Sequence, residues 1–347
     1  MPVTEDAVLL RTEGRTAYVT LNRPEAINAL DHAMALRLDA ALHAWVEDAG
    51  VAAVVIAGAG ERGLCAGGDI RAVHADVSRG DGSEAIDFWR DEYRLNAFIA
   101  RYPKPYIALM DGIVMGGGVG ISGHGSVRVV TERSRVAMPE TGIGFVPDVG
   151  GTYLLSRAPG ELGTHLALTG GAVGAADAIA CGLADHFIPA SRLARFAAAL
   201  AERDVADVLP EFAAEPPAGV LGAQRDWIDA CYGAATAEEI VDRLEAGGIA
   251  AAKQTAQTIL QKSPTSVKLT LEAVRRARRL GGLEPVLEQE FRVSSNAVRL
   301  PDLVEGIRAQ IIDKDRDPRW SPATLAEVPR ELVEGCFAPT AHGTLFG

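Results

Sequence analysis

Two acidic residues and two glycine-rich segments are the parts of this chain best suited to chemistry. Glu140 and Asp148 lie eight residues apart in a mostly apolar stretch that is bounded by glycines. Carboxylates kept among apolar side chains tend to have raised pKa values and can serve as acid, base or nucleophile. The segments 65–69 (CAGGD) and 115–119 (MGGGV) let backbone N–H groups approach a ligand closely. Together these features indicate chemistry at a carbonyl group.

The two glycine segments could each donate one N–H group to the same oxygen atom. An oxyanion hole needs such a preorganised pair of donors. The alternative is that the glycines only allow a helix to pack tightly on a strand. For the acids, the alternative is a surface or capping role, since Pro147-Asp148 can form a turn. A spacing of eight does not put the acids on one helical face, so they could meet only through a bend, which Gly142 and Gly144 permit.

Other catalytic motifs are less well matched. Residues 118–123 fit GxGxxG, but a dinucleotide fold has this motif in its first βα turn, whereas several elements come first here. Ser122, His124 and Asp148 are near one another in sequence, yet the GxSxG pattern of a serine hydrolase is missed by one position. We therefore expect Ser122 and His124 to pack or cap near the glycine turn. The seven histidines show no HxH or HExxH pattern, so no metal site is predicted.

Composition limits the class of protein. A length of 347 residues is compatible with about two domains. The net charge of −12 argues against nucleic acid as a partner. Apolar runs such as 51–59 are too short to span a bilayer, so no membrane partner is expected. The N-terminal segment MPVTEDAVLLR has acids where a signal peptide would be basic or apolar, which predicts a cytoplasmic protein. The four scattered cysteines predict neither disulfides nor a zinc site.

The one strong basic run comes late in the chain, in a segment expected to be helical. It consists of Arg275, Arg276, Arg278 and Arg279. Such a run is usually a solvated face. The alternative is a seat for phosphate groups or for an acidic neighbouring subunit.

The first 203 residues predict alternating strands and helices. Residues 7–21 alternate around Gly14 and predict a β-hairpin. Apolar runs predict buried strands at 51–57 and 106–110, and 187–188 is a short extended piece. Helical periodicity predicts helices at 28–46, 83–101, 175–182 and 192–203, whereas 71–82 reads as a mobile polar connection. This order predicts an α/β core.

The remainder is predicted to be helical. Residues 204–222, with three prolines, indicate a linker between a core domain (1–203) and a C-terminal helical region (223–347). Ser263 and Pro264 form a helix-start signal. The predicted helices cover 224–232, 237–246, 249–262, 264–280, 283–297 and 303–313.

Four motifs together resemble the enoyl-CoA hydratase/isomerase (crotonase) superfamily. They are LNRPEAINAL (21–30), LCAGGDI (64–70), KPYIALMDGIVMGGGVGIS (104–122) and MPETGIGFVPDVGG (138–151). Within it, three later segments are closest to the branch that hydrolyses 3-hydroxyisobutyryl-CoA. These are SPTSVKLT (263–270), EFRVSSNAV (290–298) and EGIRAQIIDKDRDPRWSPATLAEV (305–328). The resemblance covers nearly the whole chain.

This resemblance implies a crotonase-like spiral of ββα units with a C-terminal α-helical region that covers CoA and mediates oligomers, either trimers or dimers. It implies an acyl-CoA substrate, with no metal and no cofactor beyond the CoA of the substrate. By position, the oxyanion-hole amides are those of Gly68 and Gly117, and the catalytic and acyl-binding acids are Glu140 and Asp148. A further substrate-binding glutamate is Glu92.

One departure from the superfamily pattern bears on the reaction. Hydratases of this superfamily use two glutamates, and the first would stand where this chain has Gly120, while the second matches Glu140. The hydratase pair is therefore broken, and Asp148 supplies a second carboxylate. The resemblance then implies hydrolysis of 3-hydroxyisobutyryl-CoA in valine catabolism, and 3-hydroxypropionyl-CoA is the alternative substrate. The alternatives are an enoyl-CoA hydratase or isomerase, or a catalytically idle acyl-CoA-binding member.

Overall fold

The computed structural model describes residues 6–346, so the first five residues of the N-terminal segment discussed above lie outside the described part. These residues form two compact units, each assembled from three segments of the chain. The sheet unit comprises residues 6–68, 94–136 and 173–219, and the helical unit comprises 69–93, 137–172 and 220–346. Within the described part of the chain, no helix is both long and apolar enough to cross a membrane.

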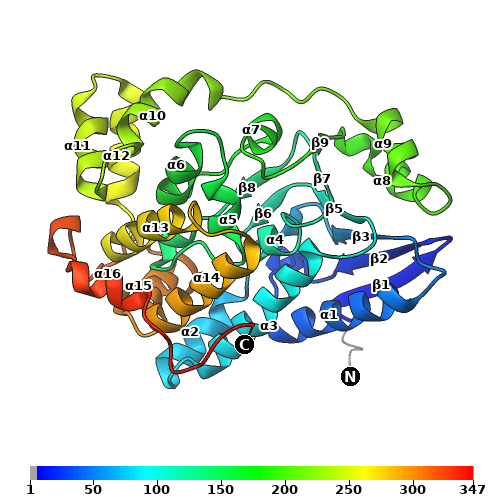
Figure 1. Cartoon of the computed structure of the whole chain (residues 1–347), viewed down its shortest axis with the longest axis horizontal. Coiled ribbons are helices and arrows are strands. Elements are labelled where there is room, and N and C mark those ends of the chain that lie inside the picture. The colour runs from blue at the N-terminus through cyan, green and yellow to red at the C-terminus, as the bar shows by residue number, and fades with distance from the viewer. Residues whose placement is uncertain (1–5, 347) are drawn as a thin grey trace. The chain divides into compact units, whose positions relative to one another are not determined.

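The sheet unit is built on a six-stranded sheet of order β1-β2-β3-β5-β7-β9 (Figure 1). The predicted hairpin is confirmed, since β1 and β2 pair in antiparallel fashion. All later neighbours pair in parallel. The strands are β1 (Val8–Glu13), β2 (Thr16–Leu21), β3 (Ala53–Gly58), β5 (Tyr106–Met110), β7 (Val127–Val130) and β9 (His186–Phe187). β3 and β5 are continuous apolar runs because a parallel strand is covered on both faces.

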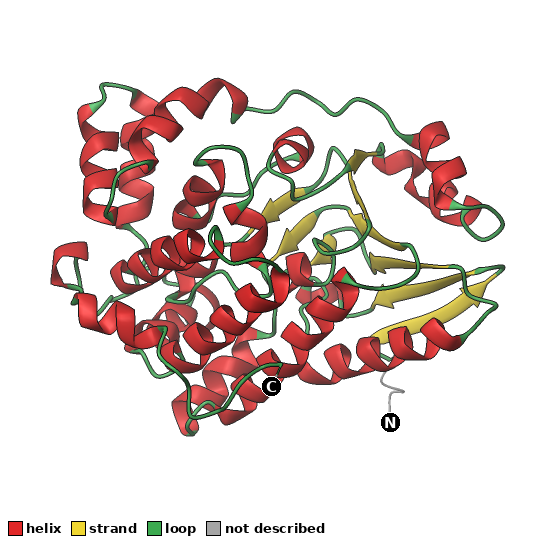
Figure 2. Ribbon diagram, in the orientation of Figure 1, coloured by secondary structure: helices red, strands yellow, loops and turns green. Residues whose placement is uncertain are grey.

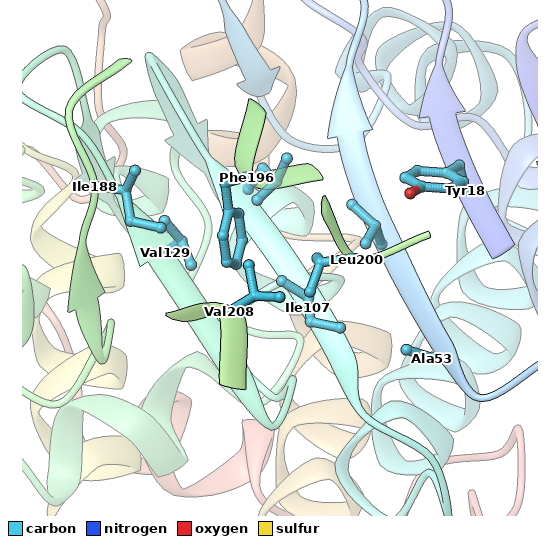
Figure 3. Close-up of a cluster of buried hydrophobic side chains, with 10 residues drawn as sticks. Tyr18, Ala53, Ile107, Val129, Ile188, Phe196, Leu200 and Val208 are labelled. Atoms are coloured by element: carbon cyan, nitrogen blue, oxygen red, sulfur yellow. The ribbon is translucent and has the colours of Figure 1, made fainter. Parts of the chain in front are cut away.

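Helices pack on this sheet through apolar side chains. Phe196 of α8 (Ala190–Ala199) and Val208 of α9 (Val205–Phe212) are fully buried against Ile107 and Val129 of the strands (Figure 3). The unit also contains α1 (His32–Glu47), whose N-cap Asp31 accepts a hydrogen bond from the N–H of Met34, and α7 (Ala175–Ala180). The expected α/β arrangement is therefore present.

The helical unit contains no strand of the six-stranded sheet (Figure 2). Ser263 caps α13 by accepting from the N–H of Ser266, and Pro264 occupies the first turn, as predicted. Its helices are α2 (Ile70–Arg79), residues 83–93 of α3 (Ser83–Ala100), α5 (Gly151–Ser156), α6 (Leu162–Thr169), α10 (Arg225–Tyr232), α11 (Ala237–Ala246), α12 (Ala250–Leu260), α13 (Pro264–Ala277), α14 (Leu283–Ala297), α15 (Pro301–Ile307) and α16 (Arg330–Cys336).

The prediction of a mobile polar connection at 71–82 was wrong. This segment is α2, whose Ile70, Val73 and Val77 repeat at helical spacing, with Val73 buried. The Asp76 carboxylate accepts from the N–H of Ala85 and so joins α2 to the start of α3. Charged residues on the exposed face obscured this narrow apolar stripe.

The segment 204–222 is more than an extended linker, because it contains α9. The side chain of Val208, in this helix, is fully buried and belongs to the core cluster of the sheet unit. The compact units also group the chain differently from the predicted consecutive domains, since the helical unit takes segments 69–93 and 137–172 from within the predicted core. Those two segments carry Glu92, Glu140 and Asp148.

Candidate active site

The two glycine segments lie side by side in the sheet unit. They follow β4 (Gly63–Cys65) and β6 (Ile113–Met115), which pair in parallel, so both leave the same edge of a small three-stranded sheet. Gly67 has a φ of +116°, and a Cβ there would stand 3.3 Å from the carbonyl oxygen of Met115 and 3.8 Å from the nitrogen of Gly117. The structure thus brings together two segments that the sequence could not show to be neighbours.

The glycines of these segments have different tasks. A Cβ on Gly118 would stand 2.5 Å from the carbonyl oxygen of Cys65, so this glycine serves tight packing. Gly117 begins the single turn α4 (Gly117–Gly120), where an N–H has no intrahelical acceptor. Within residues 6–346, neither the N–H of Gly117 nor that of Gly68 makes a hydrogen bond to protein. Both remain available as donors.

The serine of the glycine turn is occupied structurally, as expected. Ser122 is buried, and its hydroxyl donates to the carbonyl oxygen of Gly118 at 2.6 Å. A hydroxyl committed to a helix carbonyl is a packing feature rather than an activated nucleophile. The prediction that Ser122 packs or caps near the glycine turn is confirmed, and the role observed is packing.

Glu140 and Asp148 meet through a bend in the helical unit. Glu140 begins a 3₁₀ turn, η2 (Glu140–Ile143), which ends at Gly144 with a φ of +74°. The carbonyl oxygen of Glu140 accepts from the N–H of Phe145, and Trp89 of α3 stacks on the Phe145 ring at 4.9 Å. The bend reverses the chain, so that the charge of Asp148 raises the pKa of Glu140.

Helix α3 adds a third acid and a tyrosine to this cluster. Glu92 is 2% exposed, and its Oε1 has no hydrogen-bond partner among the described residues. The Tyr93 hydroxyl donates to Oδ2 of Asp148 at 2.7 Å. Burial, followed by the charge of Asp148, raises the pKa of Glu92 well above its usual value. The three acids predicted from the sequence therefore belong to one buried cluster.

Burial and hydrogen bonding act differently on the pKa values of Glu140 and Asp148. Burial is the main reason that the pKa of Glu140 lies well above the usual value, and its Oε2 has no partner within the described part of the chain. Burial also raises the pKa of Asp148, but the Tyr93 hydrogen bond opposes this and leaves it at about 7. Asp148 therefore titrates close to neutral pH beside a Glu140 whose pKa is raised, and a coupled pair of this kind can pass a proton between substrate and protein.

A fourth acid, Glu290 of α14, was not assigned a role from the sequence. It is 1% exposed and accepts from the N–H groups of Gly150 and Thr152 and from the Thr152 hydroxyl. Burial raises its pKa to about 8, against the effect of these hydrogen bonds. One signal was available, because Glu290 falls on the apolar face of the predicted helix, four residues after Val286 and three after Leu287.

The basic run at the end of α13 mostly contacts its own chain. Arg275 donates to the carbonyl oxygens of Ala234 and Ala235, and Arg276 pairs with Glu272 at 2.6 Å. Arg278 pairs with Glu161 at 2.6 Å. These three side chains are therefore not an open seat for phosphate groups. Within the described residues, no three His, Cys, Asp or Glu side chains are grouped so as to hold a metal ion.

The sequence matches known proteins over nearly its full length. The profile of the enoyl-CoA hydratase/isomerase family matches residues 16–337. The chain is 40% identical to the mitochondrial 3-hydroxyisobutyryl-CoA hydrolase of Gallus gallus, over 97% of this chain and 90% of that protein. It is also 40% identical to the mitochondrial 3-hydroxyisobutyryl-CoA hydrolase of Homo sapiens, over 96% of this chain and 88% of that protein.

Two crystal structures are similar over nearly the whole chain. One is described as a carnitinyl-CoA dehydratase from Mycobacterium thermoresistibile, with a TM-score of 0.94, 53% identity, and 97% of each chain covered. The other is described as an enoyl-CoA hydratase from Rhodobacter sphaeroides, with a TM-score of 0.92 and 43% identity, covering 98% of this chain and 99% of that one. The predicted fold class is confirmed by these likenesses.

Proposed function

This chain belongs to the enoyl-CoA hydratase/isomerase family, and we propose that it is a member of the branch that hydrolyses 3-hydroxyisobutyryl-CoA to the free hydroxy acid and CoA. The observation that carries the proposal is the buried cluster of Glu92, Glu140 and Asp148, in a chain that has Gly120 where a hydratase would have its first glutamate. The near-full-length likeness to curated hydrolases of this ester supports the same reaction.

The reaction needs stabilisation of a negatively charged oxygen. Attack on the thioester carbonyl moves charge onto its oxygen, and two preorganised N–H donors lower the barrier. We assign these donors to Gly68 and Gly117, whose N–H groups have no acceptor among the described residues. Loss of one such donor costs roughly 3 kcal/mol in comparable enzymes. A bulky replacement at Gly117 would obstruct that position.

The carboxylates divide the remaining work. Glu140 either attacks the carbonyl carbon, forming an anhydride that water then cleaves, or takes a proton from the attacking water. In both routes the C–S bond breaks, and the proton that the departing thiolate takes up comes from Asp148, which is protonated again as water adds to the acyl group. Glu140 has to ionise first, and the charge of Asp148 opposes this. A proton on Asp148, or a hydrogen bond to it from the substrate's 3-hydroxyl, would weaken its charge and so lower the pKa of Glu140 and prepare it to react. Asn at position 148 would also be neutral, but it could not donate a proton to the thiolate.

Hydration of an enoyl-CoA is the rival reaction, because the two similar crystal structures are described as a dehydratase and a hydratase. Adding water across C=C requires two carboxylates that orient the water and protonate carbon. Gly120 removes the side chain that would supply the first of them. The missing side chain therefore favours hydrolysis of the thioester over hydration. The third possibility is an idle acyl-CoA-binding protein, which would carry out neither reaction.

One assay separates the three possibilities. 3-Hydroxyisobutyryl-CoA and crotonyl-CoA are supplied separately, and free thiol and loss of the double bond are followed. A hydrolase releases thiol from the first compound, a hydratase consumes the double bond of the second, and an idle member does neither. Supplying 3-hydroxypropionyl-CoA in parallel measures the acyl preference.

A variant then tests the assigned residue. Glu140→Gln should lower thiol release at least about 100-fold, because it removes an acid-base or nucleophilic carboxylate. Glu245→Gln, at an exposed position of α11, is the matched control and should keep the wild-type rate. Thiol release near the wild-type rate by a folded Glu140→Gln protein would refute the assignment.

Valine catabolism, the cytoplasmic location and the homo-oligomer remain predictions. The similar hydrolases carry the word mitochondrial in their names, so the location of this chain calls for direct measurement in its own cells. Size-exclusion chromatography with light scattering measures the oligomeric state.

A further inference from the structure

Helix α14 presents two buried polar side chains one turn apart. Glu290 is 1% exposed and Ser294 is fully buried. Residues four apart lie on the same face of a helix. Buried polar groups of this kind need hydrogen-bond partners. The partners of Glu290 follow Asp148 in the chain, and the partner of Ser294 is the tyrosine that donates to Asp148. Neither residue has a part in the reaction proposed above.

Glu290 is attached to the turn that follows Asp148. Its Oε2 accepts from the N–H of Gly150 at 2.6 Å, and its Oε1 accepts from the N–H and the hydroxyl of Thr152 at 2.9 and 2.5 Å. The two carboxylate oxygens therefore accept three hydrogen bonds from two residues of one short segment. These bonds connect positions about 140 residues apart in sequence, 140 for Gly150 and 138 for Thr152.

This turn needs an external support because its backbone is strained. Val149 has a φ of +53°, which is uncommon for any residue with a side chain and a clear outlier for a β-branched one. The N–H of Gly151 donates to the carbonyl oxygen of Asp148 at 2.6 Å and closes the turn. A strained conformation persists only where its surroundings hold it, and the Glu290 carboxylate binds directly after Val149.

Ser294 supports Asp148 from its side-chain end. The Tyr93 hydroxyl lies 2.7 Å from Oδ2 of Asp148 and 3.0 Å from the Ser294 hydroxyl. The single proton of Tyr93 is donated to the carboxylate, so the Ser294 hydroxyl donates to the Tyr93 oxygen. The Tyr93 ring also packs edge-to-face with Phe291 of α14, with 6.3 Å between ring centres and an angle of 89° between the rings. The direction of the Tyr93 hydroxyl is thus set by α14.

We propose that α14 positions Asp148, with Glu290 holding the backbone of its strained turn and Ser294 orienting the tyrosine that donates to its carboxylate. The inference rests on the proposed function only in assigning Asp148 to the reaction. Glu290 and Ser294 are positioning residues, since their contacts reach Thr152, Gly150 and Tyr93 rather than the reacting atoms. If Glu290 only stabilised the fold, replacing it would lower the activity by the same factor whether or not Asp148 is present.

Single variants measure the size of the effect. In Glu290→Gln, an amide NH2 replaces one of the two acceptors, so it faces a donor at Gly150 or at Thr152. Losing a buried hydrogen bond and setting two donors against each other should lower kcat/KM by about 10- to 100-fold. Thr152→Val removes only the hydroxyl donor, and Ser294→Ala removes only the donor to Tyr93, so about 3- to 10-fold is expected for each. Glu284→Gln, on the exposed face of the same helix, is the matched control and should leave the rate unchanged.

A double-mutant cycle separates positioning from general stabilisation. Glu290→Gln and Asp148→Asn are combined, and kcat/KM is measured for all four proteins. If Glu290 acts through Asp148, adding Glu290→Gln to Asp148→Asn changes the residual rate less than about 3-fold. Equal reductions in both backgrounds, or a single variant with the wild-type rate, would overturn the proposal. If Glu290→Gln does not fold, Thr152→Val replaces it in the cycle.

Crystallography provides the readout if Asp148→Asn has no measurable rate. In Glu290→Gln or Thr152→Val, a lost Tyr93–Asp148 hydrogen bond supports positioning, whereas an intact bond in a protein with reduced activity contradicts it. The proposed function is judged separately by thiol release from the unchanged enzyme. If the enzyme hydrates crotonyl-CoA instead, the same cycle is scored on that reaction.

Discussion

Replacing Asp148 by Asn should stabilise the protein while removing its activity. Asp148 is 6% exposed, and burial raises its pKa from 3.8 to about 7. The folded state therefore holds a proton on Asp148 between about pH 4 and pH 7 that the unfolded state releases. Stability contributed by this group is fully present below pH 3.8 and is lost as the pH rises through 7. Asn cannot ionise and avoids this loss.

The size of the effect follows from the pKa. A pKa that rises from 3.8 to about 7 corresponds to roughly 4 kcal/mol between the protonated and ionised forms. The advantage of Asp148→Asn over the wild type should be about 1.5 kcal/mol at pH 5 and about 4 kcal/mol at pH 8. The charge of Asp148 also raises the pKa values of Glu92 and Glu140, so its removal eases the ionisation of both.

Thermal unfolding from pH 5 to pH 8 measures this difference. Between pH 5 and pH 8 the free-energy advantage of Asp148→Asn over the wild type grows by about 2.5 kcal/mol. For a chain of this length, the Tm of the variant should therefore exceed that of the wild type by roughly 3 to 4 °C more at pH 8 than at pH 5. Asp226→Asn, at an exposed position of α10, is the control and should follow the wild type throughout. Thiol release from 3-hydroxyisobutyryl-CoA is measured on the same samples and should be lost only in Asp148→Asn.

Two results would contradict this reasoning. A difference in Tm that does not change between pH 5 and pH 8 would mean that Asp148 has an ordinary pKa in the folded protein. A variant less stable than the wild type at pH 8 would mean that the ionised carboxylate stabilises the fold through Tyr93 more than burial destabilises it.

Two further predictions concern packing. Phe196→Ala removes a fully buried ring from the cluster under α8 and α9 and should cost about 3 to 5 kcal/mol, measured as a lower Tm with thiol release per folded molecule retained. Gly144→Ala places a Cβ 2.0 Å from the carbonyl oxygen of Asp302 at a φ of +74°, so it should reduce both stability and thiol release. Gly222→Ala, where a Cβ meets nothing within 4 Å, should change neither, and a stable, active Gly144→Ala protein would refute the stated packing.

Much of the fold could be predicted because its signals are local. The hairpin around Gly14, the apolar strands β3 and β5, and the start of α13 at Ser263 each depend on residues within a few positions of one another. α2 was missed because its apolar stripe is narrow and charged residues are interspersed along it. The motifs around Glu140 and Asp148 are also local in sequence, so these two acids could be identified as candidates before the fold was known.

The state of those acids was decided by the tertiary structure. The Tyr93–Asp148 bond connects residues 55 positions apart, and Glu290 reaches Thr152 across 138 positions. No local pattern specifies such pairs, because they depend on the path of the whole chain between them. The amino-acid sequence by itself determined which residues could do chemistry and the local elements that carry them. Burial and long-range hydrogen bonds, which exist only after folding, determined the pKa values and the orientation of those residues.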